Sequence, residues 1–256
     1  MILRTLGVIP ARLASTRLTR KPLRVLAGRP LLAWVVEAAR ACSQLDQVVV
    51  ATDATEIAEL CAGLQVPCVM TSPDLPSGTD RMHAVAQQPA YRAYDVYVNV
   101  QGDEPFLRAE HIAGLLAPFK RAEVGVTTLK VPCPPEDVAN PNTVKVVSAT
   151  DGRALYFSRA TIPYHRDAAL RSALPFSQPA PEYWKHLGLY AYRKRTLDLF
   201  PALPPSALEQ AECLEQLRLL ENRIHLHVEP TPYDTIGIDT EADLQRAEEL
   251  LRHPTP

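Results

Sequence analysis

Cysteine is scarce in this chain of 256 residues, and its five cysteines show no pairing pattern. They are odd in number, scattered, and include no C-x-x-C, which argues against a disulfide framework and against a zinc site. No apolar run approaches the about 20 residues of a membrane helix, and the first residues are too short an apolar run for a secretion signal. We therefore expect a cytoplasmic protein with no membrane partner.

A strong charge of one sign is also lacking. The 27 Lys and Arg nearly balance the 29 Asp and Glu, for a formal charge of -2, and no block of like charges occurs. Nucleic acid is therefore not an expected partner. The sequences G-x-x-x-x-G-K-[ST] and G-x-G-x-x-G are absent as well, which argues against a Walker-type ATPase and a dinucleotide reductase.

The first half of the chain alternates apolar β-rich runs with segments of helical spacing. The β-rich runs cover residues 5–10, 47–53, 66–71 and 96–101, and the helical segments cover residues 30–42 and 56–64. This alternation predicts successive βαβ units, and continuous apolar strands predict a mostly parallel Rossmann-type sheet covered on both faces. Ligands of such sheets bind outside the carboxyl ends of the strands, so we expect the loops after residues 5–10 and after VNVQ to face one crevice.

The second half predicts shorter strands with tight turns. They are expected at residues 123–131, 143–148, 154–159, 185–194 and 223–230, with a surface loop or hairpin at 164–183. One helix is expected over residues 206–222, with Ser206 and Glu209 in capping-box spacing, then a short strand ending at Asp239 and a helix from about 241 to 251. We expect a single α/β domain over residues 1–256, with a parallel half over about 1–130, a smaller β-rich lobe over about 131–230 and a closing strand and helix over 231–256.

A basic loop follows the first predicted strand. Within residues 10–23 it gathers four cations, Arg12, Arg17, Arg20 and Lys21, beside the hydroxyls of Ser15 and Thr16. Guanidinium groups bind phosphate oxygens bidentately and lysine adds a compact charge, so the loop suits a polyphosphate. A solvated basic loop is the alternative reading.

Two carboxylates stand where predicted strands end. Asp103 follows the run VYVNVQ together with Gln101, and Asp239 precedes Thr240, which can cap the next helix. Mg²⁺ usually takes one or two protein carboxylates while it bridges phosphate oxygens, so both could hold Mg²⁺; a turn and a helix cap are the alternatives. Together with Arg12 and Lys21 they suit metal-assisted phosphoryl or nucleotidyl transfer.

Two further stretches are less diagnostic by themselves. His186 and Tyr190 share one face of a strand only if the strand is regular, and a lone strand histidine is more often structural than functional. Glu215, Gln216 and Arg218 in the predicted helix also suit a salt-bridged solvated face.

The whole set of motifs resembles one family. IPARLASTRL, SGTDR, VNVQGDEP, NPNTVKVV, ALYFSRATIPY, HLGLYAY, LEQLRLLE and GIDTEADL together are similar to the 3-deoxy-D-manno-octulosonate (Kdo) cytidylyltransferases, from about residue 5 to 250. The resemblance implies a nucleotide-diphospho-sugar transferase fold, a homodimer formed through the second half, and Mg²⁺ as cofactor. It also implies transfer of CMP from CTP to the anomeric hydroxyl of Kdo, with release of pyrophosphate, to supply CMP-Kdo for lipopolysaccharide synthesis.

The resemblance also assigns roles to residues. It implies a nucleotide-binding half over about 1–130 and a sugar-binding and dimerisation half over about 131–230. Catalysis would fall to Arg12, Lys21, Asp103 and Asp239, with the two aspartates as the Mg²⁺ ligands. The nucleotide-binding residues would be Arg12, Ser15, Arg17, Lys21, Ser77 and Arg81. The sugar-binding residues would be Arg81, Gln101, Arg159, His186, Tyr190, Glu215 and Gln216, with Arg159 at the sugar carboxylate.

Two other functions remain open at the level of sequence. A related synthetase could activate sialic acid or an amino analogue of Kdo, and the residues expected to face the sugar would discriminate it. A catalytically dead nucleotide-binding protein is the alternative from another class, although binding alone would not require two separated carboxylates.

Overall fold

The computed structural model describes residues 3–14, 18–166 and 183–252. Most of the loop or hairpin expected at residues 164–183 lies outside these ranges, as do Ser15 and Arg17. The described strands are β1 (Thr5–Ala11), β2 (Val25–Leu26), β3 (Arg29–Pro30), β4 (Gln47–Thr52), β5 (Cys68–Met70), β6 (Val96–Asn99), β7 (Val126–Pro132), β8 (Lys145–Ser148), β9 (Ala154–Ser158), β10 (Trp184–Arg193) and β11 (Leu226–Pro230).

Nine of these strands form one mixed sheet. Its order is β11-β7-β10-β6-β1-β4-β5, with β8 paired to β10 and β9 paired to β8, while β2 and β3 form a separate small ribbon. The first-half strands β6, β1, β4 and β5 run parallel, as the apolar runs predict. The long β10 runs antiparallel to both β6 and β7. It therefore joins the parallel strands to a second lobe, which consists of β7, β8, β9, β10 and β11.

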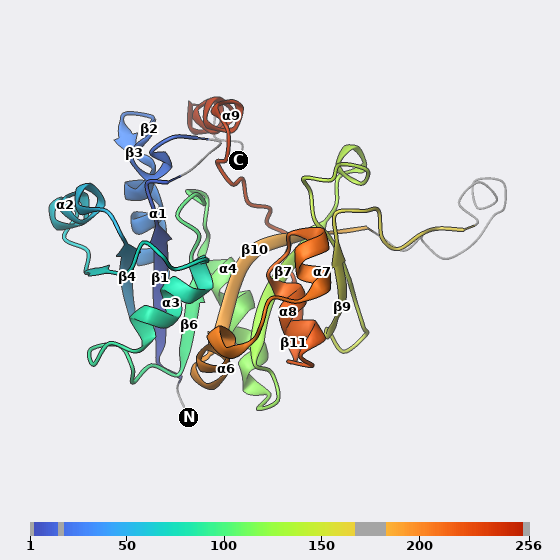
Figure 1. The fold of residues 1–256 in the computed structure, drawn as a ribbon. Helices are drawn as coiled ribbons and strands as arrows, with labels where there is room; N and C mark the ends of the chain where they lie inside the picture. The colour runs from blue at the N-terminus through green and yellow to red at the C-terminus, as the bar shows by residue number, and fades with distance from the viewer. Residues whose placement is uncertain (1–2, 15–17, 167–182, 253–256) are drawn as a thin grey trace.

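Helices cover both faces of this sheet (Figure 1). The α-helices of the described residues are α1 (Leu31–Arg40), α2 (Thr55–Gly63), α3 (Gly78–Ala86), α4 (Ala109–Leu116), α6 (Lys194–Leu199), α7 (Ala207–Glu212), α8 (Gln216–Glu221) and α9 (Glu241–Arg252). The apolar side chains of α1, α2 and α4 share one core with the sheet, and those of α3, α6 and α8 share the core on the opposite face. The predicted fold class is therefore confirmed.

Helix α1 shows why the sequence forms this arrangement. Leu32, Val35, Val36 and Ala39 recur at helical spacing and are all buried against the sheet. Such spacing places apolar side chains on one stripe, while charged residues such as Glu37 stay on the exposed face.

The strands of the second lobe pair in a closed circuit. The circuit runs β11-β7-β10-β8-β9, and one antiparallel bridge between Arg153 and His227 joins its ends. Buried side chains such as Val146, Phe157 and Val228 fill this lobe. In this circuit β8 is held by its pairing with β10, and the start of β9 is held by the bridge to β11.

The helix predicted over residues 206–222 is wrong in its middle. It is two helices, α7 and α8, because Cys213 adopts a left-handed conformation with φ of 52° and ends α7. The capping box of Ser206 and Glu209 at the start of α7 is confirmed by hydrogen bonds in both directions. The short strand expected before Asp239 is also wrong, because residues 231–239 form neither strand nor helix.

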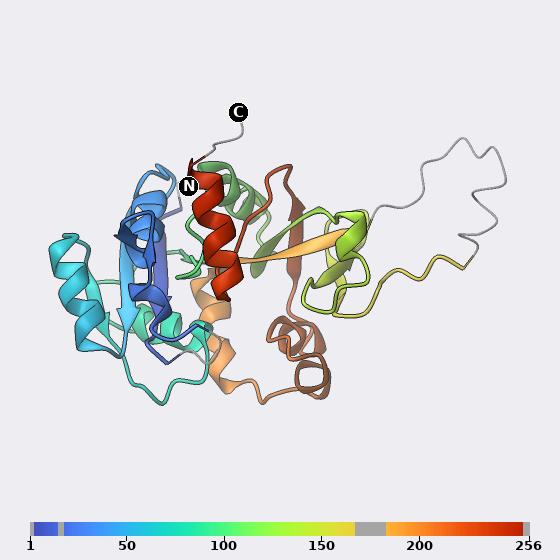
Figure 2. The same cartoon turned by 90° about the horizontal axis from the view of Figure 1, so that it is seen from above.

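Helix α9 begins as predicted and lies at the same end of the molecule as the β2–β3 ribbon (Figure 1). Thr240 caps it, since its Oγ1 accepts a hydrogen bond from the Asp243 amide at 3.2 Å. Viewed from above, α9 lies between the first-half helices and the second lobe (Figure 2). Its buried Leu244 and Ala247 pack with Leu18, Leu26 and Ile238 in a small separate core.

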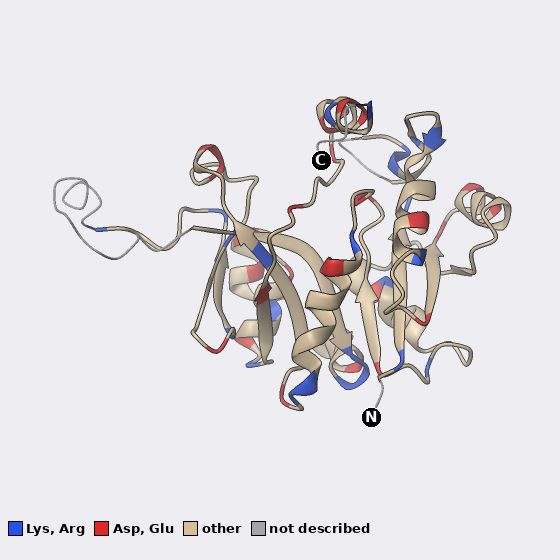
Figure 3. Cartoon of the chain, turned by 180° about the vertical axis from the view of Figure 1, so that it is seen from behind, with Lys and Arg blue, Asp and Glu red and all other residues tan. Residues whose placement is uncertain are grey.

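Charged side chains are interspersed over the molecule. Figure 3 shows acidic and basic residues mixed on the described elements of both lobes. Within the described residues, none of the helices has the length and apolar character that a bilayer crossing demands.

Candidate active site

Two cavities meet at the carboxyl ends of β1 and β6. The first cavity, of about 790 Å³, lies over the basic loop and the start of α3; the second, of about 940 Å³, lies over β10, the segment 134–144 and the start of α9. Gln101, Asp103 and Asp239 line both. The sequence-based expectation that the loops after the first strand and after VNVQ share one crevice is confirmed.

Glycine brings the two strand ends together. A Cβ at Gly102 would stand 2.8 Å from the carbonyl oxygen of Pro10, so only glycine lets the loop after β6 pass this close to β1. The amide of Ile238 donates to the Asp103 carbonyl at 3.0 Å, which fixes the segment carrying Asp239 against the same loop.

Lys21 joins the two carboxylates. Its Nζ donates to Asp103 Oδ2 at 2.6 Å and to Asp239 Oδ1 at 2.8 Å. Burial opposes the charge on this ammonium, but attraction by Asp103 and hydrogen bonds to both carboxylates outweigh it and raise the pKa of Lys21. The site therefore holds one cation and two carboxylates at the junction of the cavities.

The first cavity contains the described residues of the predicted nucleotide set. Arg12 lines the cavity with an exposed side chain. Ser77 caps α3, since its Oγ accepts a hydrogen bond from the Asp80 amide at 3.2 Å, and the buried Arg81 lines the cavity from the same helix. Arg81 is 3% exposed and ion-paired to Asp53 at 3.0 Å, so its guanidinium is held rigidly by the protein. Arg20 lines neither cavity and pairs instead with Glu56 of α2.

The second cavity contains Gln101, His186 and Tyr190. Gln101 Nε2 donates to the Gly188 carbonyl at 3.2 Å, and the rings of His186 and Tyr190 lie 5.5 Å apart. The pairing of β10 with β7 shifts register between Leu187 and Tyr190, so the strand is not regular, yet both rings line one cavity. Burial lowers the pKa of His186 to about 3, so this imidazole is neutral near pH 7.

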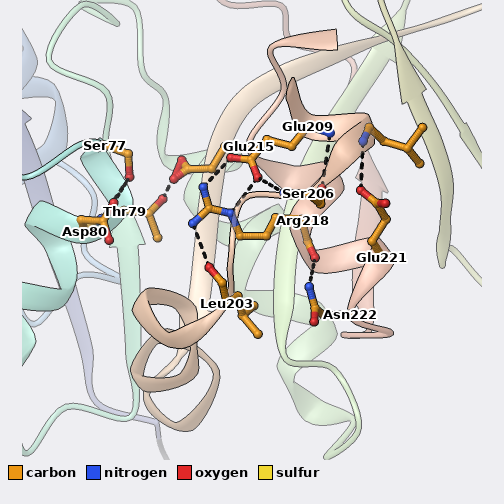
Figure 4. A network of polar contacts seen from close by, with 11 residues as sticks. Ser77, Thr79, Asp80, Leu203, Ser206, Glu209, Glu215, Arg218, Glu221 and Asn222 are labelled. Carbon is orange, nitrogen blue, oxygen red and sulfur yellow. Dashed lines mark hydrogen bonds and ion pairs between the residues drawn. The ribbon is translucent and has the colours of Figure 1, made fainter. Parts of the chain in front are cut away.

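The break between α7 and α8 places Glu215 and Gln216 at the second cavity. Thr79 donates to Glu215 Oε2 at 3.1 Å, which links the start of α3 to this turn (Figure 4). Burial raises the pKa of Glu215 against hydrogen bonds from Ser77 and Thr79 that lower it. Among the described residues, Glu215 Oε1 and Gln216 Nε2 are buried without a hydrogen-bond partner, so both atoms are suited to a polar ligand.

Arg159 is not brought together with the other predicted residues. It lines neither cavity, and its guanidinium donates to the carbonyls of Glu212 at 2.8 Å and Pro141 at 3.0 Å. Its expected contact with a carboxylate therefore gains no support from the geometry. Ser15 and Arg17 lie outside the described residues.

Sequence reasoning missed several residues of the second cavity. Glu104 is buried there, and burial together with the neighbouring Asp103 raises the pKa of Glu104 to about 8. Lys185, bound to both oxygens of Asp234 at 2.9 Å, lines the same cavity. The motif VQGDEP did contain a signal for Glu104, because its second carboxylate has no role in a simple turn.

Within the described ranges, no group of three or more His, Cys, Asp or Glu side chains could hold a metal ion. Asp103 and Asp239 form a two-carboxylate donor set. Such a set suits an ion that completes its coordination with water and substrate oxygens.

The comparisons with known proteins agree with this geometry. A family model described as "Cytidylyltransferase" matches residues 6–226. The chain is 57% identical to a 3-deoxy-manno-octulosonate cytidylyltransferase of Acidobacterium capsulatum over 97% of each chain. The chain belongs to the 3-deoxy-manno-octulosonate cytidylyltransferase family.

Two further proteins match over nearly the whole of this chain. A 3-deoxy-manno-octulosonate cytidylyltransferase of Koribacter versatilis is 54% identical over 97% of this chain and 90% of its own length. A solved structure of CMP:2-keto-3-deoxy-manno-octonic acid synthetase complexed with CTP is 37% identical and superposes with a TM-score of 0.89, over 98% of this chain and 100% of that one. The fold and the family predicted from the motifs are confirmed.

Proposed function

We propose that this protein transfers CMP from CTP to the anomeric hydroxyl of Kdo and releases pyrophosphate, supplying CMP-Kdo for lipopolysaccharide synthesis. One observation carries the proposal: a cation-lined cavity and a polar cavity meet at Gln101, Asp103 and Asp239. A transfer between two substrates requires two binding volumes that share the reacting point. The names of the relatives identify the two substrates.

The first cavity is the proposed CTP site. Arg12 and Lys21 lie where a triphosphate would need positive charge, and they would stabilise the negative charge of the departing pyrophosphate. Ser77 and Arg81 line the same volume at the start of α3 and would contact the nucleoside. Ser15 and Arg17 remain predictions for this site.

The second cavity is the proposed Kdo site. Its polar groups include Gln101, Tyr190 and the buried atoms Glu215 Oε1 and Gln216 Nε2, which need partners that sugar hydroxyls can provide. The neutral His186 offers hydrogen bonds without adding charge. Gln101 lies at the junction, so it can orient the attacking hydroxyl towards the α-phosphorus.

Asp103 and Asp239 are the proposed Mg²⁺ ligands. Lys21 Nζ lies within 3 Å of an oxygen of each, so both carboxylates already converge on one cation. Two carboxylates beside a phosphate-binding cavity fit the oxygen donors and partial hydration that Mg²⁺ prefers. When bound, Mg²⁺ would offset phosphate charge and help to make the sugar hydroxyl a better nucleophile. In the residues of the chain itself, Lys21 holds the two carboxylates in register and supplies charge to the phosphates.

We also propose that the protein acts in the cytoplasm and forms a homodimer. All five cysteines are free thiols, which suits a reducing compartment. Leu155 on β9 is 52% exposed and Tyr164 is 85% exposed, and burying such side chains against a second copy would be favourable. Sedimentation of the purified protein measures the oligomeric state, and a monomer at micromolar concentration would contradict the dimer.

The test is pyrophosphate release from CTP and Mg²⁺, with Kdo, its 8-amino analogue and N-acetylneuraminic acid offered in parallel. Release that strongly favours Kdo supports both the reaction and the substrate. Release with another acid retains the mechanism and changes the substrate. Folded protein that binds CTP and is silent with all three acids would instead be a nucleotide-binding module.

A further inference from the structure

The segment between β7 and β8 forms one wall of the second cavity. Glu136, Asp137, Asn140, Asn142 and Thr143 line the cavity from this segment. The segment stands at the same end of the sheet as α9 (Figure 1). Apart from the 3₁₀ turn Pro135–Asp137 it has no helix or strand, so contacts outside regular secondary structure must fix its shape.

Lys145 supplies one set of these contacts. Its side chain is 0% exposed, and its Nζ donates to the carbonyl oxygens of Asn140 at 2.7 Å, Thr143 at 2.5 Å and Arg159 at 2.8 Å. An ammonium has three donors, so every one of them is used. Burying a lysine costs free energy unless its charge is well solvated by the protein, and here the wall itself provides two of the three acceptors.

Arg159 holds the same wall from the other side. Its Nη1 donates to the Pro141 carbonyl at 3.0 Å, and its Nε donates to the Glu212 carbonyl at 2.8 Å. The backbone amide of Arg159 also donates to Glu212 Oε2 at 2.9 Å. Since the Arg159 carbonyl accepts from Lys145, the two side chains form one unit that ties residues 140–143 to β9 and α7.

We propose that Lys145 and Arg159 form a clamp that positions residues 140–143 as a wall of the second cavity and so determines the affinity for the sugar. The two are positioning residues, because they act through the wall and neither lines a cavity. The inference rests on the proposed function for the identity of the sugar. It gives Arg159 a role other than the carboxylate contact expected from sequence.

The clamp predicts a split between the two substrates. None of the wall residues lines the first cavity. Lys145→Met and Arg159→Met should each raise the KM for Kdo by about tenfold, while the KM for CTP stays within about twofold, because only the second cavity loses its shape. Equal changes in both KM values would indicate a general structural role and overturn the proposal.

Arg193→Met is the matched control. Arg193 also donates to backbone carbonyls, those of Val124 at 2.8 Å and Arg121 at 2.9 Å, but it lines neither cavity. Its loss should lower the melting temperature without changing either KM. Arg159→Lys, which keeps the charge but has fewer donors, should give a smaller rise in the KM for Kdo than Arg159→Met and covers the case in which a Met variant does not fold.

An uncharged ligand tests whether Arg159 acts as a clamp or contacts the sugar carboxylate directly. The C1 amide of Kdo lacks the carboxylate charge, and its inhibition constant can be measured beside the KM for Kdo. With a clamp, Arg159→Met weakens both ligands by the same factor. Weakening of Kdo alone would make Arg159 a carboxylate ligand and overturn the proposal.

Hydrogen exchange tests the clamp without any substrate. In the free protein, Lys145→Met should speed exchange of the amides of residues 137–144, and Arg193→Met should leave them unchanged. Unchanged exchange in the Lys145 variant would overturn the clamp. A wild-type protein that fails to turn over Kdo would contradict the proposed function instead, and the exchange result would still decide whether the wall is clamped.

Discussion

Lys21 and Asp239 are separated by 218 positions in the sequence, yet Lys21 Nζ and Asp239 Oδ1 are 2.8 Å apart. The same Nζ binds Asp103, so the basic loop, the loop after β6 and the segment before α9 converge on one ammonium. Lys21 therefore organises the junction of the two cavities before any substrate arrives.

Lys21→Met should lower kcat/KM for CTP by about 100-fold, because it removes charge from the phosphates and leaves two carboxylates facing each other. Arg20→Gln is the matched control, since the adjacent Arg20 pairs with Glu56 and lines neither cavity. Steady-state kinetics with varied CTP measures both variants. Equal losses in the two would show that the loop needs positive charge in general rather than Lys21 at this position.

Asp103→Asn and Asp239→Asn should each lower turnover at least about 100-fold at saturating substrates, since each removes one carboxylate of the proposed metal site. Glu241→Gln is the control. Glu241 lies two residues after Asp239, but it pairs with Arg24 and lines neither cavity, so turnover should stay unchanged. Turnover is measured over a Mg²⁺ titration, with thermal unfolding to verify the fold. Near-normal turnover in either asparagine variant would exclude that residue as a ligand.

His186 should make the protein less stable in acid. Its pKa is lowered from 6.5 to about 3 in the folded state, so the unfolded chain binds this proton more readily. The stability that the neutral imidazole provides is present above about pH 6.5 and is lost as the pH falls towards 3. Between pH 6.5 and 5 wild type should lose on the order of 1–2 kcal/mol more than His186→Gln does. Urea unfolding at each pH gives the two curves, and parallel curves would contradict the expectation.

Gly102→Ala should lower both stability and activity. The added Cβ would stand 2.8 Å from the Pro10 carbonyl oxygen, so the loop after β6 must move away from β1, at a cost of about 1–3 kcal/mol. Gly63→Ala is the control, because a Cβ at the end of α2 meets no atom within 4 Å and alanine favours a helix by up to about 1 kcal/mol. Chemical unfolding and CTP turnover measure both. A Gly102 variant as stable and active as the Gly63 variant would show that the two strand ends tolerate separation.

Cys213→Gly should stabilise the protein by about 0.5–1 kcal/mol, because glycine adopts the left-handed conformation seen at φ of 52° without a steric penalty. In one continuous helix the same change would cost about 1 kcal/mol. The sign of the change in unfolding free energy therefore distinguishes two helices from one.

The strands and the meeting of the two loops could be predicted because they depend on local pattern and parallel topology. Val48, Val49 and Val50 are apolar without interruption because β4 is buried on both faces. The position of Asp103 at a strand end then places it at the ligand-binding edge. Asp239 could be assigned to the same site as Asp103, because both are carboxylates that suit one metal ion.

The parts that could not be predicted depend on contacts distant in sequence. Residues 206–222 have good helical propensity throughout, but burial of Leu214 and the bond from Thr79 to Glu215 favour a turn after Cys213. Ile236 and Ile238 suggest a strand, yet Ile238 packs against Leu18 and Leu244. The guanidinium of Arg159 binds carbonyl oxygens, which every residue carries, so no sequence pattern reveals its partners.

The late position of Asp239 affects the order in which the junction of the two cavities is completed during synthesis of the chain. Arg12, Lys21, Gln101, Asp103 and the β10 residues of the second cavity all precede it in the chain. A ribosome makes the chain in that order, so every residue that lines the first cavity except Asp239 is made before the segment that completes the junction. The junction of the two cavities is therefore completed last, and a chain that ends before Asp239 would also lack α9 and the core that Leu244 and Ala247 form with Leu18 and Leu26.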